Sequence, residues 1–125
     1  ARAAYNGHLD CLKYARENGC LWDERTCHYA AEGGHLECLK YAHENECKWG
    51  FETCAYSTIN GHLDCLKYAS ENGWSCDIWT CNYAARYGHL DCLKYARENG
   101  CPYDKKKCLQ ESKNDEIKNY IETYM

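Results

Sequence analysis

Apolar and polar positions along this chain recur with a fixed period. The string Gly-His-Leu-Asp/Glu-Cys-Leu-Lys-Tyr-Ala begins at Gly7, Gly34, Gly61 and Gly88, so each copy starts 27 residues after the previous one. Self-similarity with a period of about 20 to 50 residues is typical of stacked supersecondary units that cannot bury their apolar faces alone. The pattern therefore predicts a repeat protein.

Each unit is predicted to contain two helices, and the first of them contains the repeated string. At 100° per residue, the apolar residues of the string fall on one side of a helix and its charged residues on the other. This helix is expected to end at Asn18-Gly19, because glycine readily adopts the left-handed conformation that closes a helix. The second unit has Asn45-Glu46 instead, so either Asn45 closes the helix or the turn differs.

The second helix is predicted over residues 24–32 of the first full unit and over the matching residues of the others. Aspartate is a preferred N-cap residue, because its side chain accepts a hydrogen bond from a free backbone N–H group. The predicted caps are Asp23, Asp77 and Asp104. Ala30 and Ala31 are expected to face inward, where small side chains let neighbouring helices approach closely.

The segment Thr26 to Ala42 reads Thr-Cys-His-Tyr-Ala-Ala-Glu-Gly-Gly-His-Leu-Glu-Cys-Leu-Lys-Tyr-Ala and resembles the ankyrin repeat pattern Thr-Pro-Leu-His-x-Ala-Ala-x-x-Gly-His-Leu-Glu. The resemblance covers nearly the whole chain and implies an all-α, ankyrin-like α-solenoid of stacked helix-turn-helix repeats. The unit departs from the usual 33 residues, and Cys27 stands where the family has proline. It looks like the short variety known from giant viruses and protists, which lacks most of the projecting hairpin.

We expect a single repeat domain over residues 1–125. Its expected divisions are a partial repeat (1–6), full repeats (7–33, 34–60 and 61–87) and a last repeat with a C-terminal capping helix (88–125). Ala3-Ala4 match Ala30-Ala31 in register, so further repeats are expected before residue 1. Polar residues replace several core positions after residue 105, which is typical of a capping unit.

Charge and hydropathy narrow the classes of partner. The chain has 15 Lys and Arg residues spread evenly against 19 Asp and Glu residues, for a net charge of -4. Binding to a phosphate backbone requires a basic stripe, which this pattern lacks, so nucleic acid is not expected as a partner. No apolar run approaches the roughly 20 residues that a membrane-spanning helix needs.

Twelve cysteines in 125 residues would be typical of a disulfide framework in a short secreted chain. Equivalent cysteines of stacked units should lie about 8–10 Å apart, whereas a disulfide needs Cα atoms within about 7 Å. A bond within a unit, between Cys20 and Cys27, stays open. The third unit, however, exchanges Cys and Trp at two loop positions, which indicates that cysteine fills volume there. We therefore expect buried reduced thiols and a reducing compartment, cytoplasmic or nuclear.

The sequence gives little support for a metal site or for catalysis. The spacings contain no Cys-x-x-Cys or His-x3-5-His pair, so a zinc site is the least favoured use of the cysteines. His8, His35, His62 and His89 open the first helix of each unit and are expected to form hydrogen bonds at the helix start and the interhelix turn. No Ser-His-Asp set or Gly-rich phosphate loop occurs. We expect no enzyme activity, no cofactor, no metal and no small-molecule substrate.

Comparison of the units with one another predicts a partner-binding surface. The first helix repeats the same charges in every unit, whereas the second helix varies at positions expected to face outward, as recognition requires. In the ankyrin family this second helix lines the concave groove. The predicted site residues are Arg25, His28, Tyr29, Phe51, Glu52, Tyr56, Ile59, Ile78, Trp79, Asn82, Tyr83 and Arg86. Tyr29, Tyr56 and Tyr83 lie at the same position of successive units, and packing of neighbouring rings along the stack explains this row equally well.

The favoured function is therefore a non-enzymatic scaffold that binds another protein through its concave face. Two alternatives remain. The chain could be a structural solenoid segment or a subunit of a larger assembly, in which case alanine at Trp79 would change nothing. It could also be a thiol or zinc-binding module, which requires a bound metal or a reactive thiolate.

Overall fold

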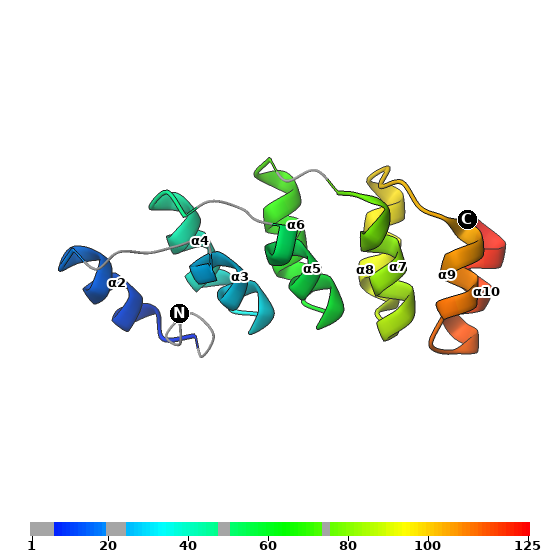
Figure 1. Ribbon diagram of the computed structural model, residues 1–125, viewed down its shortest axis with the longest axis horizontal. Helices are drawn as coiled ribbons and strands as arrows, with labels where there is room; N and C mark the ends of the chain where they lie inside the picture. The colour runs from blue at the N-terminus through cyan, green and yellow to red at the C-terminus, as the bar shows by residue number, and fades with distance from the viewer. Residues whose placement is uncertain (1–6, 20–24, 48–50, 74–75) are drawn as a thin grey trace.

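The computed structural model describes residues 7–19, 25–47, 51–73 and 76–125, without the side chains of residues 11, 25–28 and 51–52. Every element in these ranges is a helix, and the helices lie in pairs along one row with α2 and α10 at opposite ends (Figure 1). The all-α solenoid predicted from the sequence is confirmed. The helices are α2 (Leu9–Glu17), α3 (Arg25–Glu32), α4 (Leu36–Glu44), α5 (Phe51–Ile59), α6 (Leu63–Glu71), α7 (Ile78–Tyr87), α8 (Leu90–Glu98), α9 (Lys105–Glu111) and α10 (Asp115–Tyr124).

The helices form two rows that pack with different closeness. Contacts between neighbouring repeats are denser along α3, α5, α7 and α9, here called the concave row, than along α2, α4, α6 and α8, here called the convex row. A stack bends toward the row whose helices lie closer together. Small buried side chains explain the close approach, because the distance between packed helices depends on the residues at their contact. These are Ala30, Ala31, Ser57, Thr58, Ala84 and Ala85.

The core lies between the two rows and repeats with the sequence. Leu39, Leu66 and Leu93 of the convex row are almost fully buried, and each such burial stabilises the fold by roughly 1.5–3 kcal/mol. Between α9 and α10 the core continues through Ile117 and Ile121, which are also fully buried. None of the described helices has the length and apolar character that crossing a membrane requires.

The first helices of the repeats end at the predicted Asn-Gly pairs. The sequence left open how the helix before Asn45-Glu46 ends. Gly19 and Gly100 close their helices with φ of 76°. At the corresponding place Glu46 itself adopts the left-handed conformation, with φ of 73°. The N–H of Cys47 then donates to the carbonyl oxygen of Ala42 at 2.9 Å. The turn is thus the one that glycine makes, although the left-handed region costs a non-glycine residue about 1–2 kcal/mol.

Two of the predicted N-caps are confirmed. The Oδ1 atom of Asp77 accepts a hydrogen bond from the backbone N–H of Trp79 at 3.0 Å. The Oδ1 atom of Asp104 accepts one from the backbone N–H of Lys107 at 3.2 Å. Asp23 lies outside the described residues. Each of these bonds satisfies a backbone donor at the start of a helix.

The repeated histidines join neighbouring repeats. The Nε2 atom of His62 donates to the carbonyl oxygen of Glu32 at 3.1 Å, and that of His89 donates to the carbonyl oxygen of Ile59 at 2.8 Å. Each imidazole also covers the glycine of the preceding repeat, so a Cβ added to Gly61 would lie 2.6 Å from the ring of His89. The repeated Gly-His pair is therefore a clamp between repeats. The sequence had predicted only local bonds at the helix start and turn.

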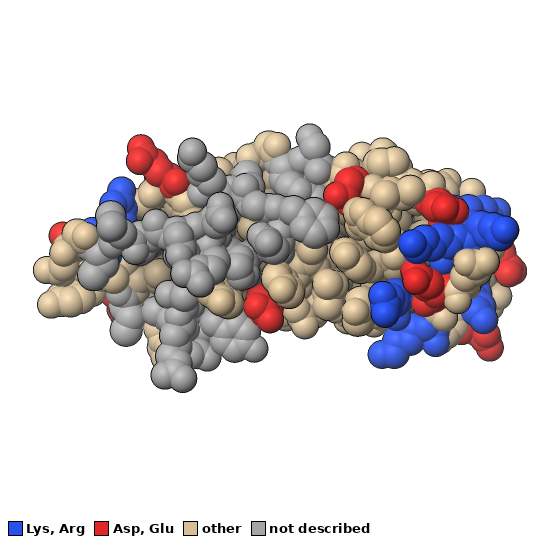
Figure 2. All heavy atoms as spheres, in the orientation of Figure 1, with Lys and Arg blue, Asp and Glu red and all other residues tan. Residues whose placement is uncertain are grey.

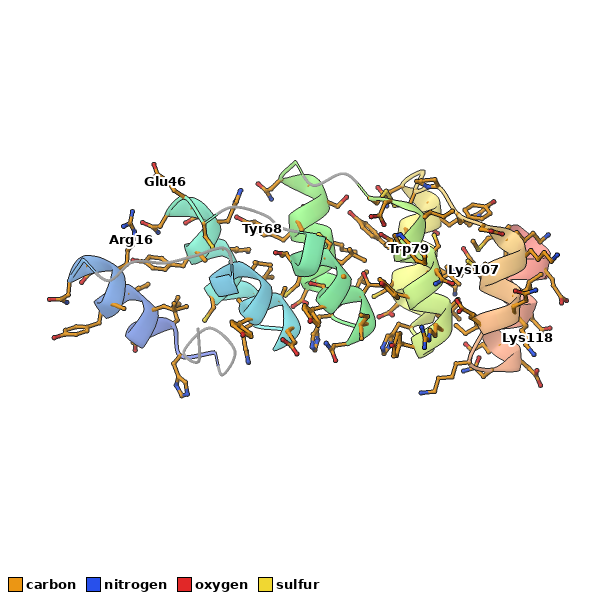
Figure 3. The ribbon with its side chains drawn as sticks, in the orientation of Figure 1. Arg16, Glu46, Tyr68, Trp79, Lys107 and Lys118 are labelled. Carbon is orange, nitrogen blue, oxygen red and sulfur yellow. A yellow bond between two sulfur atoms is a disulfide. The ribbon has the colours of Figure 1, made fainter. Side chains whose placement is uncertain are left out.

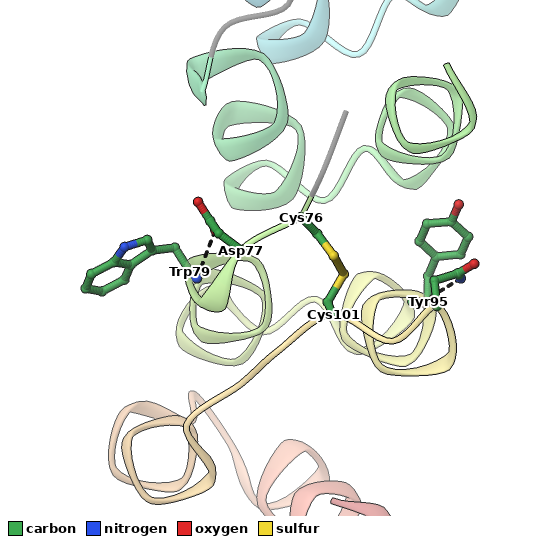
Figure 4. Close-up of a disulfide and its surroundings, with 6 residues drawn as sticks. Cys76, Asp77, Trp79, Tyr95 and Cys101 are labelled. Carbon is green, nitrogen blue, oxygen red and sulfur yellow. Dashed lines mark hydrogen bonds between the residues drawn. A yellow bond between two sulfur atoms is a disulfide. The ribbon is translucent and has the colours of Figure 1, made fainter. Parts of the chain in front are cut away.

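The expectation of reduced thiols is wrong for one pair of cysteines. Cys76 and Cys101 form a disulfide with Cα atoms 5.6 Å apart (Figure 4). Cys76 precedes the N-cap of α7, and Cys101 lies in the loop before α9. They occupy different positions in neighbouring repeats. Disulfides between repeats were argued against only for cysteines at equivalent positions, so that reasoning did not apply to this pair. For the other pair considered, Cys20 lies outside the described residues and the side chain of Cys27 is not described, so this bond stays untested.

The remaining described cysteines are buried free thiols, as predicted: Cys38, Cys47, Cys54, Cys65, Cys81, Cys92 and Cys108.

Candidate partner-binding site

An exposed line of aromatic rings lies along α7. Trp79, Tyr83 and Tyr87 are spaced by four residues, which places them on one face of the helix. The rings of Trp79 and Tyr83 are stacked with centroids 6.1 Å apart, and those of Tyr83 and Tyr87 are tilted with centroids 6.5 Å apart. Trp79 and Tyr87 keep 40% and 38% of their surface exposed. We call these three residues the aromatic line.

An N-cap and a disulfide fix the start of α7, the helix that carries the aromatic line. Asp77 caps the helix by accepting the hydrogen bond from the N–H of Trp79. The preceding residue, Cys76, is covalently tied to Cys101 in the loop that leads into α9 (Figure 4). Rigid support of this kind lowers the entropy lost when a partner binds.

Basic side chains lie at both ends of the aromatic line. The Nζ atom of Lys107, from α9, lies 4.7 Å from the centroid of the Trp79 ring, and Figure 3 shows the two side chains next to each other. The guanidinium carbon of Arg86 lies 5.6 Å from the centroid of the Tyr87 ring. Cations over aromatic faces gain roughly 0.5–1 kcal/mol at exposed sites. These contacts leave the cations available to negative groups of a partner.

The predicted site residues differ from one another in how exposed their side chains are. Ile78, Trp79 and Arg86 are exposed. The other described members except Asn82 are half-buried: Tyr29, Tyr56, Ile59 and Tyr83. The side chains of Arg25, His28, Phe51 and Glu52 lie outside the described part of the structure. Tyr83 packs against Trp79 and Tyr87 within its own helix.

Asn82 does not face outward as the sequence comparison assumed. Only 4% of its surface is exposed, and its Oδ1 atom is buried without a hydrogen-bond partner in the part of the chain that the structure describes. Variation at this position reflects packing within the closely spaced concave row rather than contact with solvent. Asn82 is therefore not part of the exposed surface.

Two residues of this surface were missed by the sequence comparison. Tyr87 corresponds to Gly33 and Asn60 in earlier repeats, so its aromatic character was a visible signal. Lys107 corresponds to the buried Thr53 and Thr80, so nothing in the repeat register suggested that it would cover the Trp79 ring.

The convex row differs because its lysines contact the neighbouring repeat. The Nζ atoms of Lys13, Lys40 and Lys67 lie 5.6–5.8 Å from the ring centroids of the tyrosines one repeat further on. Lys40 also forms an i,i+3 ion pair with Glu37 at 3.8 Å. The sequence showed only that these charges repeat in every unit. The additional ring contacts show that the repeated charges also take part in stacking.

The buried thiols are poorly suited to chemistry. Burial, with a smaller contribution from Asp64, raises the pKa of Cys65 to about 12. Burial likewise raises the pKa of Cys81 to about 12 and that of Cys108 to about 11. The thiolate is the nucleophile and the metal ligand, so these groups are almost entirely in the unreactive form at neutral pH. Within the described residues, no three His, Cys, Asp or Glu side chains are grouped to hold a metal ion.

Stacked helix pairs with a 27-residue period and Gly-His clamps at their junctions define a helical repeat protein. A family model described as ankyrin repeats (three copies) matches residues 1–80 and 27–107, and the chain therefore belongs to the ankyrin repeat family. No curated protein matches the chain. Ankyrin repeats generally mediate protein-protein interaction, and the family is typically non-enzymatic.

Proposed function

We propose that this chain is a non-enzymatic scaffold that binds a partner protein through its concave row. The observation that carries the proposal is the exposure of Trp79, a large aromatic side chain supported by a capped helix. Tryptophan and tyrosine are enriched among the residues that contribute most to protein interfaces. Tyr29, Tyr56, Ile59, Ile78, Tyr83 and Arg86 would complete this surface, together with the side chains of Arg25, His28, Phe51 and Glu52.

Substitution of Trp79 tests this function. Trp79→Ala is expected to weaken partner binding by about 2 kcal/mol or more, roughly thirtyfold, because such a residue acts as an anchor. The assay is affinity capture with partner identification, followed by a binding titration of the identified protein. Tyr14→Ala is the matched control, since Tyr14 is a 70% exposed aromatic residue of the convex row. Unchanged circular dichroism of both variants separates binding from folding.

The alternatives make different predictions for the same variants. A structural segment or a subunit of a larger assembly would lose no partner when Trp79 is replaced. A thiol or zinc-binding module would lose function on cysteine substitution while tolerating Trp79→Ala. The raised thiol pKa values favour the scaffold over that module. Native mass spectrometry of the purified protein detects any bound zinc directly.

We further propose a protein partner rather than a nucleic acid or a small molecule, and a cytoplasmic or nuclear location. The net charge of -4 supports the first, and the seven described free thiols support the second. The Cys76–Cys101 bond opposes a reducing compartment. Rapid alkylation of thiols in intact cells, followed by peptide mass analysis, decides the matter. Oxidised Cys76 and Cys101 in cells would place the protein in an oxidising compartment.

A further inference from the structure

Several basic side chains around the aromatic line have no carboxylate partner among the residues that the structure describes. Within the described residues, none of the following forms an ion pair: Arg86, Lys105, Lys106, Lys107 and Lys113. All except the half-buried Lys107 are exposed. They are five of the 15 basic residues of a chain whose net charge is -4. Figure 2 shows Lys and Arg side chains gathered at the C-terminal end of this face, with Asp and Glu side chains among them.

Two acidic side chains lie at the ends of α9, the exposed Asp104 and the half-buried Glu111. Asp104 accepts the hydrogen bond from the backbone N–H of Lys107, and the Oε2 atom of Glu111 is buried. Lysines in the first turn of a helix also oppose its dipole. Three consecutive lysines at this place therefore do not stabilise α9, and they leave a local excess of positive charge beside Trp79.

The geometry specifies what kind of segment would fit. Trp79 and Tyr87 are eight residues apart on α7, which corresponds to about 12 Å at 1.5 Å per residue. Lys107 contacts the ring at one end, and Arg86 contacts the ring at the other. An extended peptide advances about 3.3 Å per residue, so about four residues cover this distance. Negative groups at such a spacing would meet the cations while the residues between them lie on the rings.

We propose that this surface binds an acidic segment of the partner protein, in which carboxylates about four residues apart flank apolar side chains. The inference rests on the proposed function, because it names the chemistry of the partner that the concave row binds. Charge complementarity of this kind raises the association rate and excludes unsuitable partners.

Synthetic peptides test the proposal on the full chain. The probe is a fluorescein-labelled peptide with two Glu residues on either side of a Phe-Ser-Leu core, and binding is followed by fluorescence anisotropy. One control peptide replaces Glu by Gln, and a second moves all four Glu residues to one end. We expect the probe to bind about tenfold more tightly than either control. Raising ionic strength from about 0.1 M to about 1 M should weaken its binding, since the screening length falls from about 10 Å to about 3 Å.

A charge-reversal variant of α9 locates the binding site. Lys105→Glu, Lys106→Glu and Lys107→Glu together are expected to weaken probe binding by about tenfold or more. Loss of the helix would not explain this result, because glutamates in a first turn are favoured by the helix dipole. Circular dichroism and urea unfolding verify the fold.

A control variant changes the net charge equally at a distance from the aromatic line. It carries Lys67→Glu, Lys94→Glu and Lys118→Glu, all at exposed positions outside the concave row. Lys67 and Lys94 contact the rings of Tyr95 and Tyr120, so circular dichroism and urea unfolding verify the fold of this variant as well. We expect it to bind the probe within about twofold of the original protein, because distant exposed charges are screened at physiological ionic strength. Equal loss in both variants would overturn the assignment to this surface.

The outcomes separate this inference from the proposed function. A captured partner that depends on Trp79, but binds the α9 variant normally, refutes the acidic segment and leaves the scaffold function standing. A partner that binds Trp79→Ala unchanged refutes the proposed function itself. Tighter binding of single-stranded oligouridylate than of the probe would also overturn the inference, in favour of nucleic acid.

Discussion

Reduction of the Cys76–Cys101 disulfide removes a covalent link between neighbouring repeats, and its cost follows from the loop that it closes. The two residues are separated by 25 positions. In the chain-entropy treatment, a cross-link lowers the entropy of the unfolded chain by about 2.1 + 1.5R ln n cal/mol/K for a loop of n residues, which gives about 3.5 kcal/mol at 25 °C. We expect reduction to lower the free energy of unfolding by about this amount.

Urea unfolding followed by far-ultraviolet circular dichroism measures the change, with and without a dithiol reductant. The double variant Cys76→Ser/Cys101→Ser serves as the control. It should unfold like the reduced original protein, to within about 1 kcal/mol for the altered side chains. It should also be insensitive to the reductant. Hydrogen exchange of α9 and α10 shows whether the loss of stability is concentrated at the C-terminal end, as nearest-neighbour coupling between repeats predicts.

Equal free energies of unfolding with and without reductant would refute the reasoning. Such a result would mean that the bond does not constrain the unfolded chain or does not form. If the reductant also lowered the free energy of unfolding of the double variant, other cysteines would be responsible for the change.

Three further changes test the packing. Gly61→Ala should cost about 3 kcal/mol more than Gly100→Ala, because the two glycines share a positive φ but only Gly61 lies against His89. Glu46→Gly should stabilise the fold by about 1 kcal/mol, since it removes the cost of φ at 73°. Asn82→Ala should be neutral or stabilising by about 1 kcal/mol, because it removes an unpaired buried oxygen. Urea unfolding measures all four variants.

Opposite results would identify the faulty step. Equal costs at the two glycines would mean that the histidine clamp moves aside freely. Loss of stability in Glu46→Gly would show that the glutamate side chain contributes more than its backbone conformation costs. A large loss in Asn82→Ala would point to an ordered water bonded to the buried oxygen.

Local features were predictable from sequence because their physics is local. Asp77 and Asp104 cap helices through backbone groups two or three residues away, so the residue type at one position was sufficient. The helix stop at Gly19 depends on the conformational freedom of a single residue. The apolar period likewise located Leu39 in the core, because a helix that packs on one side buries that side.

Features formed between repeats were harder to predict. The disulfide joins Cys76 to Cys101, and the bond from His89 goes to a carbonyl 30 residues earlier. Comparison of equivalent positions cannot detect contacts between different positions of neighbouring repeats. The prediction that Asn82 faces outward was wrong for a related reason. Variation among units was interpreted as exposure, although the position is buried in the concave row. The aromatic line was only partly predicted, since Tyr87 lies at a position occupied by Gly or Asn elsewhere.

The Gly-His clamp has a consequence for inheritance. At the junctions that His62 and His89 form, one repeat offers the next a helix-end carbonyl and a bare glycine backbone. Gain or loss of 27 codons in the gene therefore keeps the Gly-His contact at the new junction. Array length is free to change through unequal recombination, whereas Cys76 and Cys101 must be inherited as a pair to keep their bond.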